Sequence, residues 1–124
     1  MTATDHATEL VLAAARAAGD KLGTNLVAFD VSEQLAITDA FLLVSAANDR
    51  QVKAVVEAVE DGLREIGAKP IRREGGRDGR WVLLDYGDIV VHVQHEEERE
   101  FYALERLWRD CPAIELPADV TDQR

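Results

Sequence analysis

Two histidines and one cysteine are the residues in this sequence whose types first suggest chemistry. His92 and His95 are three residues apart in or near a predicted strand. Successive strand side chains point to opposite faces, so these two cannot chelate one metal ion together. We instead expect His92 to be partly buried with a hydrogen-bond partner. Cys111 is the sole cysteine, which predicts neither an internal disulfide nor a metal site.

Four aspartates form the other chemical candidate, a metal-dependent phosphoryl-transfer site. Such a site usually places two carboxylates close together to hold Mg²⁺. The candidates are Asp30, Asp39, Asp85 and Asp88, but the sequence contains no D-x-D pair, and a turn already explains Asp88. Ser45 lies in an apolar strand and not on a G-x-S-x-G elbow. We therefore predict no catalytic residue, no metal and no cofactor.

The glycine-rich segment 74–80 (EGGRDGR) invites comparison with phosphate-binding loops. It lacks the G-x-G-x-x-G and G-x-x-x-x-G-K-[ST] spacings, and no helix follows it to face a phosphate. We predict a hairpin loop. The one cluster of basic residues in the chain lies in and around this loop and consists of Arg72, Arg73, Arg77 and Arg80. The charge distribution of the whole chain is therefore dipolar.

Composition narrows the class of protein and its partners. The chain has 124 residues, a net charge of −10 and a pI of about 4.6, which fits one domain with a real core. Nucleic-acid binding depends on Lys and Arg, so little direct contact with RNA or DNA is expected, whereas a basic protein partner fits. The first 22 residues do not read as a signal peptide, and no apolar run reaches the roughly 20 residues of a membrane span. We expect a cytoplasmic protein.

Hydrophobic periodicity predicts two long helices, at 5–22 and 48–66. In the second, Asn48 is placed as the N-cap and apolar residues recur with helical spacing from Val52 to Ile66. Strands are predicted at 26–31, 40–46, 70–73, 81–86 and 89–94. In the run 40–46, the residues at both odd and even positions are apolar, which favours a central strand that is covered on both faces of the sheet.

Most of the aromatic residues lie between Trp81 and Trp108, a segment that forms either the main core or a binding face. Alternation puts Trp81, Leu83 and Asp85 on one face of the first strand and Val82, Leu84 and Tyr86 on the other. The acidic run 96–98 suits a helix start, and the helix is expected to continue to Trp108. The predicted fold is a mixed α/β domain over 1–110 with a five-stranded sheet and flanking helices. Residues 111–124, with two prolines, are predicted to be a flexible tail.

Five segments carry a resemblance to a known family: ITDAF (37–41), RQV (50–52), EG (74–75), WVLLDYGDIVVHV (81–93) and REFYALERLW (99–108). In this order and spacing they resemble the ribosomal silencing factor family, also called iojap-like proteins. The resemblance implies a fold similar to the nucleotidyltransferase fold without its catalytic residues. It also implies a non-enzymatic protein that binds the large ribosomal subunit through ribosomal protein number fourteen. Binding there would block subunit joining and repress translation when nutrients are short.

By the same resemblance, the partner-binding surface is carried onto seven residues. They are Trp81, Asp85, Tyr86, His92, Arg99, Tyr102 and Trp108. The turn SAANDRQ (45–51) departs from the Gly- and Ser-containing turn common in the family, so no contact is assigned to it. Family members can form dimers, which makes a homodimer an expectation. Two alternatives stay open: a nucleotidyltransferase-like enzyme, which rests on fold analogy alone, and a ribosome-assembly module.

Overall fold

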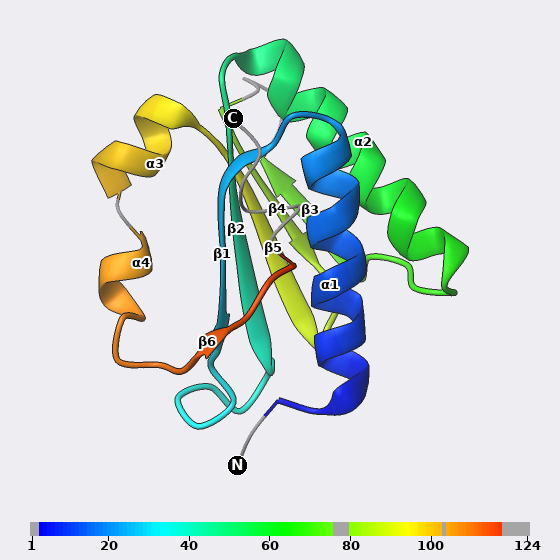
Figure 1. The fold of residues 1–124 in the computed structure, drawn as a ribbon, viewed down its shortest axis with the longest axis vertical. Helices are drawn as coiled ribbons and strands as arrows, with labels where there is room; N and C mark the ends of the chain where they lie inside the picture. The colour runs from blue at the N-terminus through cyan, green and yellow to red at the C-terminus, as the bar shows by residue number, and fades with distance from the viewer. Residues whose placement is uncertain (1–2, 76–79, 103, 118–124) are drawn as a thin grey trace.

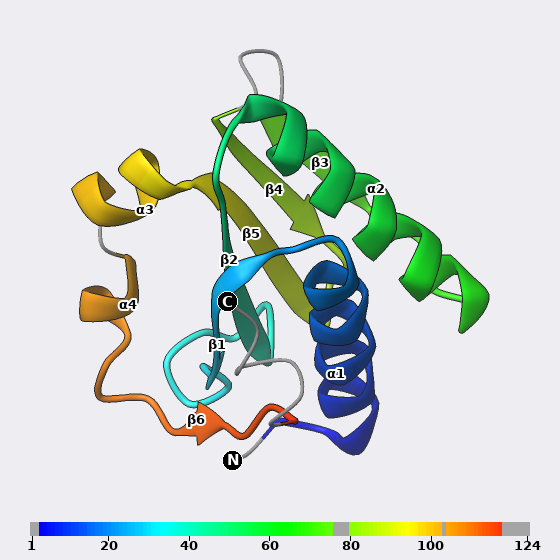
Figure 2. The same cartoon turned by 45° about the horizontal axis from the view of Figure 1, so that its top comes forward.

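A mixed sheet separates two layers of helices in the computed structural model of this chain, with α1 and α2 on one side and α3 and α4 on the other (Figures 1 and 2). The structure describes residues 3–75, 80–102 and 104–117, and for residues 100–105 it describes no side chains. Along the described chain, no helix is long and apolar enough to cross a membrane. The mixed α/β fold class is confirmed.

Both long helices begin at the caps that their sequences provide. α1 (Asp5–Asp20) starts after Thr4, whose hydroxyl accepts a hydrogen bond from the Ala7 N–H at 3.0 Å. α2 (Asp49–Glu65) starts after Asn48, whose side-chain oxygen accepts from the Gln51 N–H at 2.9 Å. The buried residues of α2 are those of its predicted apolar stripe: Val52, Val55, Val56, Val59 and Leu63. Both predicted helices are confirmed to within a turn.

The sheet has six strands in the order β3-β4-β5-β2-β1-β6. The strands are β1 (Thr24–Asp30), β2 (Ala40–Ala46), β3 (Arg72–Gly75), β4 (Trp81–Asp85), β5 (Ile89–His95) and β6 (Ala113–Ile114). β2 and β5 pair in parallel at the centre, and every other neighbouring pair is antiparallel. β2 is buried along most of its length, as its apolar residues at both odd and even positions predicted.

The sixth strand corrects the expectation of a five-stranded sheet, and it lies within the predicted tail 111–124. Ala113 and Ile114 pair with Phe29 and Ala28 of β1 at the edge of the sheet. Pro112 does not prevent this pairing, because its carbonyl accepts a hydrogen bond from the Asp30 N–H at 2.8 Å and an edge position tolerates the missing N–H. The remainder of the predicted tail, 118–124, lies outside the described residues.

Two hydrophobic clusters lie on the two faces of the sheet. The larger, which we call the main core, joins α1 and α2 to alternate residues of the strands, including Val82 and Leu84 of β4. The smaller lies on the opposite face and contains Phe29, Leu43 and Cys111. The predicted helix after β5 consists of two short helices, α3 (Glu96–Tyr102) and α4 (Leu104–Leu107), on the side of the smaller cluster.

Candidate protein-docking site

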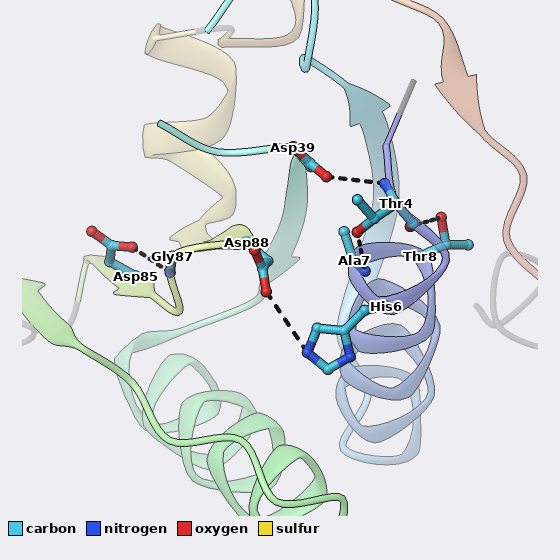
Figure 3. A network of polar contacts seen from close by, with 8 residues as sticks. All are labelled: Thr4, His6, Ala7, Thr8, Asp39, Asp85, Gly87 and Asp88. Atoms are coloured by element: carbon cyan, nitrogen blue, oxygen red, sulfur yellow. Dashed lines mark hydrogen bonds and ion pairs between the residues drawn. The ribbon is translucent and has the colours of Figure 1, made fainter. Parts of the chain in front are cut away.

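Carboxylates at one end of the sheet hold the start of the chain in place (Figure 3). Asp39 Oδ2 accepts a hydrogen bond from the Thr4 N–H at 2.9 Å, and Asp88 Oδ2 lies 3.7 Å from Nε2 of His6. The Asp39 N–H also donates to the Asp88 carbonyl at 2.9 Å. These two aspartates, candidates for a metal site on sequence grounds, position the first turn of α1.

Asp30 makes a similar set of contacts beside them. Its carboxylate accepts hydrogen bonds from the Ala3 N–H at 2.8 Å, the Ser32 hydroxyl at 2.6 Å and the Ser32 N–H at 3.0 Å. Burial alone would raise the pKa of Asp30, but these donors stabilise the ionised form and hold its pKa below the ordinary 3.8. The charged carboxylate is therefore part of the folded structure.

The fourth candidate carboxylate, Asp85, is also engaged within the chain. It accepts from the Gly87 N–H at 2.8 Å, which shapes the turn after β4, and from Arg72 at 3.3 Å (Figure 3 shows the turn). Among the described residues, no three His, Cys, Asp or Glu side chains are grouped so that they could hold a metal ion.

The sheet face opposite α1 and α2, which we call the second face, carries a row of four rings. The ring centroids of Trp81 and His92 are 6.2 Å apart, those of His92 and Phe41 are 5.2 Å apart, and those of Phe41 and Trp108 are 5.2 Å apart. The last two pairs meet edge to face, a favourable geometry for aromatic rings. The row joins β4, β5, β2 and the residue that follows α4 across the sheet.

His92 lies near the centre of this row and is 6% exposed. The Trp81 Nε1–H donates to His92 Nδ1 at 3.3 Å, which requires an unprotonated Nδ1. Burial disfavours the charged imidazolium and lowers the pKa of His92 from 6.5 to about 4. His92 therefore fixes the indole of Trp81 as a neutral hydrogen-bond acceptor, and the expected buried histidine with a partner is confirmed.

α3 is attached to the second face by polar contacts. Arg99 is 7% exposed, and its guanidinium donates to the Ser45 hydroxyl of β2 at 3.0 Å. Arg80, just before β4, donates to the Glu98 carboxylate at 2.8 Å, and this carboxylate raises the pKa of Arg80. As the acidic run predicted, α3 begins at Glu96.

The helices on this side leave part of β4 half-buried and accessible. Trp81, Leu83 and Asp85 alternate on the second face, and all three are intermediate in exposure. On the other face their neighbours Val82 and Leu84 are buried in the main core. We call Trp81, Leu83 and Asp85 the β4 strip; its two apolar members and one carboxylate make it suited to contact another protein.

The predicted site residues divide into three groups. Trp81, Asp85, His92 and Trp108 lie on the second face, as described above, and the side chain of Arg99 is buried between α3 and β2. Tyr86 lies on the other side in the main core at 7% exposure, where burial raises its pKa to about 12, so it does not belong to the β4 strip. The Tyr102 side chain lies outside the described part of the chain.

Sequence reasoning did not assign Phe41 and Leu83 to the site. Phe41 contacts both His92 and Trp108, and Leu83 lies at the centre of the β4 strip, directly opposite His92 in the strand register. Strand alternation could have identified Leu83, because it lies two residues after Trp81 and therefore on the same face of β4. Phe41 lay within a segment that carried the family resemblance, but only strand pairing places it beside His92.

These features define a small α/β domain with a strongly acidic composition and a half-exposed apolar strip on one face of its sheet. Residues 4–124 match the family model described as "Ribosomal silencing factor during starvation". The chain therefore belongs to the ribosomal silencing factor family.

Relatives in several organisms agree with this assignment. A ribosomal silencing factor of Bacillus subtilis is 40% identical over 103 residues, which are 83% of this chain and 87% of the relative. The chloroplastic Iojap protein of Zea mays is 31% identical over 112 residues, which are 88% of this chain and 47% of the relative.

Two crystal structures have the same fold. One, of a protein from Chromobacterium violaceum, has a TM-score of 0.79 and 34% identity, and the match covers 82% of this chain and 84% of that one. The other, of a protein from Bacillus halodurans, has a TM-score of 0.76 and 38% identity, with 87% of this chain and 98% of that one covered. The likeness to the nucleotidyltransferase fold stays a prediction.

Proposed function

We propose that this protein binds the large ribosomal subunit through ribosomal protein number fourteen and prevents the small subunit from joining. The observation that carries the proposal is the β4 strip, which presents Trp81 and Leu83 half-exposed beside the Asp85 carboxylate. An apolar centre with charged surroundings is the usual anatomy of a protein interface. Membership of the ribosomal silencing factor family supports a partner on the ribosome.

Charge supports a basic protein partner over direct contact with rRNA. A chain with a net charge of −10 is repelled by phosphates, and it is attracted to a basic ribosomal protein on the subunit surface. The proposed mechanism is steric occlusion, which forms and breaks no covalent bond and uses no cofactor. Translation would fall as the cytoplasmic pool of joinable large subunits falls, and the name of the family model ties this effect to starvation.

Co-sedimentation with isolated large subunits tests the binding, and light scattering of mixed subunits tests the effect on joining. The variant Leu83→Asp places a charge within the β4 strip, so we expect loss of binding and normal subunit joining. Ile66→Asp makes the same chemical change at a residue that is 43% exposed at the end of α2, away from the strip, and should bind normally. Failure of the unmodified protein to sediment with large subunits at moderate salt would refute the proposal.

Large-subunit assembly is a second candidate function. A mouse relative, 26% identical over 87 residues that are 68% of this chain and 38% of the relative, is named "Mitochondrial assembly of ribosomal large subunit protein 1". An assembly factor would bind precursors of the large subunit and leave the joining of mature subunits unchanged. The light-scattering assay separates the two functions, since only a silencing factor lowers the rate or extent of joining.

Self-association is part of the proposal, because a second copy could cover the β4 strip when no ribosome is present. Sedimentation velocity over a range of protein concentrations measures this directly. If the strip forms the dimer contact, Leu83→Asp should yield a monomer. If Leu83→Asp remains a dimer, the copies meet elsewhere.

A further inference from the structure

A shallow hollow of about 230 Å³ lies on the second face between β3 and β4. Of the described residues, Glu74, Gly75, Trp81 and Leu83 line it. Glu74 and Leu83 are opposite each other in the antiparallel register, so their side chains share this face. The hollow therefore borders the β4 strip on the side of the edge strand.

Gly75 lets the two strands approach closely at this point. Its φ is +80°, and a Cβ atom added there would lie 2.1 Å from the Trp81 carbonyl oxygen. Any other residue would force β3 away from β4. The shape of the hollow therefore depends on a glycine.

The lining combines two apolar side chains with one carboxylate. The apolar side chains are those of Trp81 and Leu83, and the carboxylate is that of Glu74. Lys and Arg have the complementary chemistry, because their aliphatic stems cover apolar surface while the cationic end reaches a carboxylate or an aromatic face. The indole cannot turn freely, since its Nε1–H donates to His92.

The charges around the hollow leave an excess of carboxylate. Arg72 lies 3.2 Å from a Glu74 oxygen and 3.3 Å from an Asp85 oxygen, so one guanidinium serves two carboxylates. The Arg72 and Glu74 side chains are 62% and 57% exposed. Exposed pairs of this kind contribute little stability, so a second cation can join or replace Arg72 at low cost.

We propose that this hollow receives a lysine or arginine side chain of the ribosomal protein partner. The inference rests on the proposed function and adds a specific contact to it: a cation that lies against Trp81 and Leu83 and pairs with Glu74. Arg72 then acts as an internal competitor for the same carboxylate. It therefore follows that removal of Glu74 weakens binding and removal of Arg72 strengthens it.

The test measures the affinity of fluorescently labelled full-length protein for isolated large ribosomal subunits. We expect Glu74→Gln to weaken binding about tenfold, the loss typical of a charge pair at an interface, and Arg72→Gln to tighten it about threefold. Two exposed residues on the helical side provide matched controls for net charge, Glu57→Gln in α2 and Arg16→Gln in α1. Each control should remain within about twofold of the unmodified protein.

Each result bears on one of the two proposals. If the unmodified protein fails to bind, the proposed function is refuted. If it binds and Glu74→Gln matches Glu57→Gln, the cation site is refuted while the proposed function stands. If Arg72→Gln weakens binding, Arg72 acts as a contact and not as a competitor, which also overturns the inference. Thermal unfolding midpoints confirm that each variant is folded.

Discussion

Mild acid should destabilise this protein through His92. The folded state holds the pKa of this imidazole at about 4, whereas its ordinary value is 6.5. Between these values the unfolded chain binds a proton that the folded protein excludes, so stability falls as pH falls. The full stabilisation is present above pH 6.5 and is lost progressively as the pH approaches 4.

The size of the effect follows from the two pKa values. At pH 5 the difference in proton binding corresponds to a loss of about 2 kcal/mol in the free energy of unfolding, and complete protonation would bring this to about 3 kcal/mol. For a domain of this size, 2 kcal/mol lowers the unfolding midpoint by about 8 °C. A protonated Nδ1 would also be unable to accept the hydrogen bond from Trp81.

Urea denaturation at pH 7 and pH 5 measures this loss, with His92→Phe as the variant that cannot titrate. We expect the unmodified protein to lose about 2 kcal/mol more than the variant over this interval. Val59→Ala, in α2 on the other side of the sheet, is the control: it lowers stability at both pH values, by roughly 2 kcal/mol, and keeps the pH dependence of the unmodified protein. Equal pH dependence in the unmodified protein and in His92→Phe would refute the reasoning.

Three further predictions concern stability. Below about pH 4 the protein should lose additional stability, because Asp30 then becomes protonated and no longer holds its N–H and hydroxyl donors as strongly as the charged carboxylate does. The variant Asp30→Asn cannot titrate, so the same urea titrations should show no such added loss. Gly75→Ala should lower the free energy of unfolding by about 2 kcal/mol or more, given the positive φ and the contact with the Trp81 carbonyl; an unchanged midpoint would show that β3 moves freely. Tyr86→Phe should be neutral or stabilising by up to about 1 kcal/mol and should bind large subunits normally, because the buried hydroxyl has no hydrogen-bond partner in the described structure.

The sequence by itself determined the local structure of this protein. Three local features depend only on residues that are near neighbours in the chain, so a single sequence is enough to specify them. They are the helix caps at Thr4 and Asn48, the apolar spacing in the helices and the alternation in the strands. Alternation also separated Tyr86 from Trp81, and the structure places these residues on the two faces that alternation predicts. Tyr86 was assigned to the binding surface by resemblance, against that local evidence.

Only the tertiary structure decided which parts of each face of the sheet are covered, and which helices cover them. The Arg99–Ser45 hydrogen bond joins residues 54 positions apart, and the contact of Phe41 with Trp108 joins β2 to the residue that follows α4. The sixth strand also depends on the edge of β1, which no property of residues 113–114 reveals. Short segments of two or seven residues have little intrinsic preference, so contacts from distant strands determine their structure. For the same reason, the sequence predicted that the aromatic segment 81–108 is either core or binding face, and only the packing of the helices determined which of its side chains are buried and which stay half-exposed.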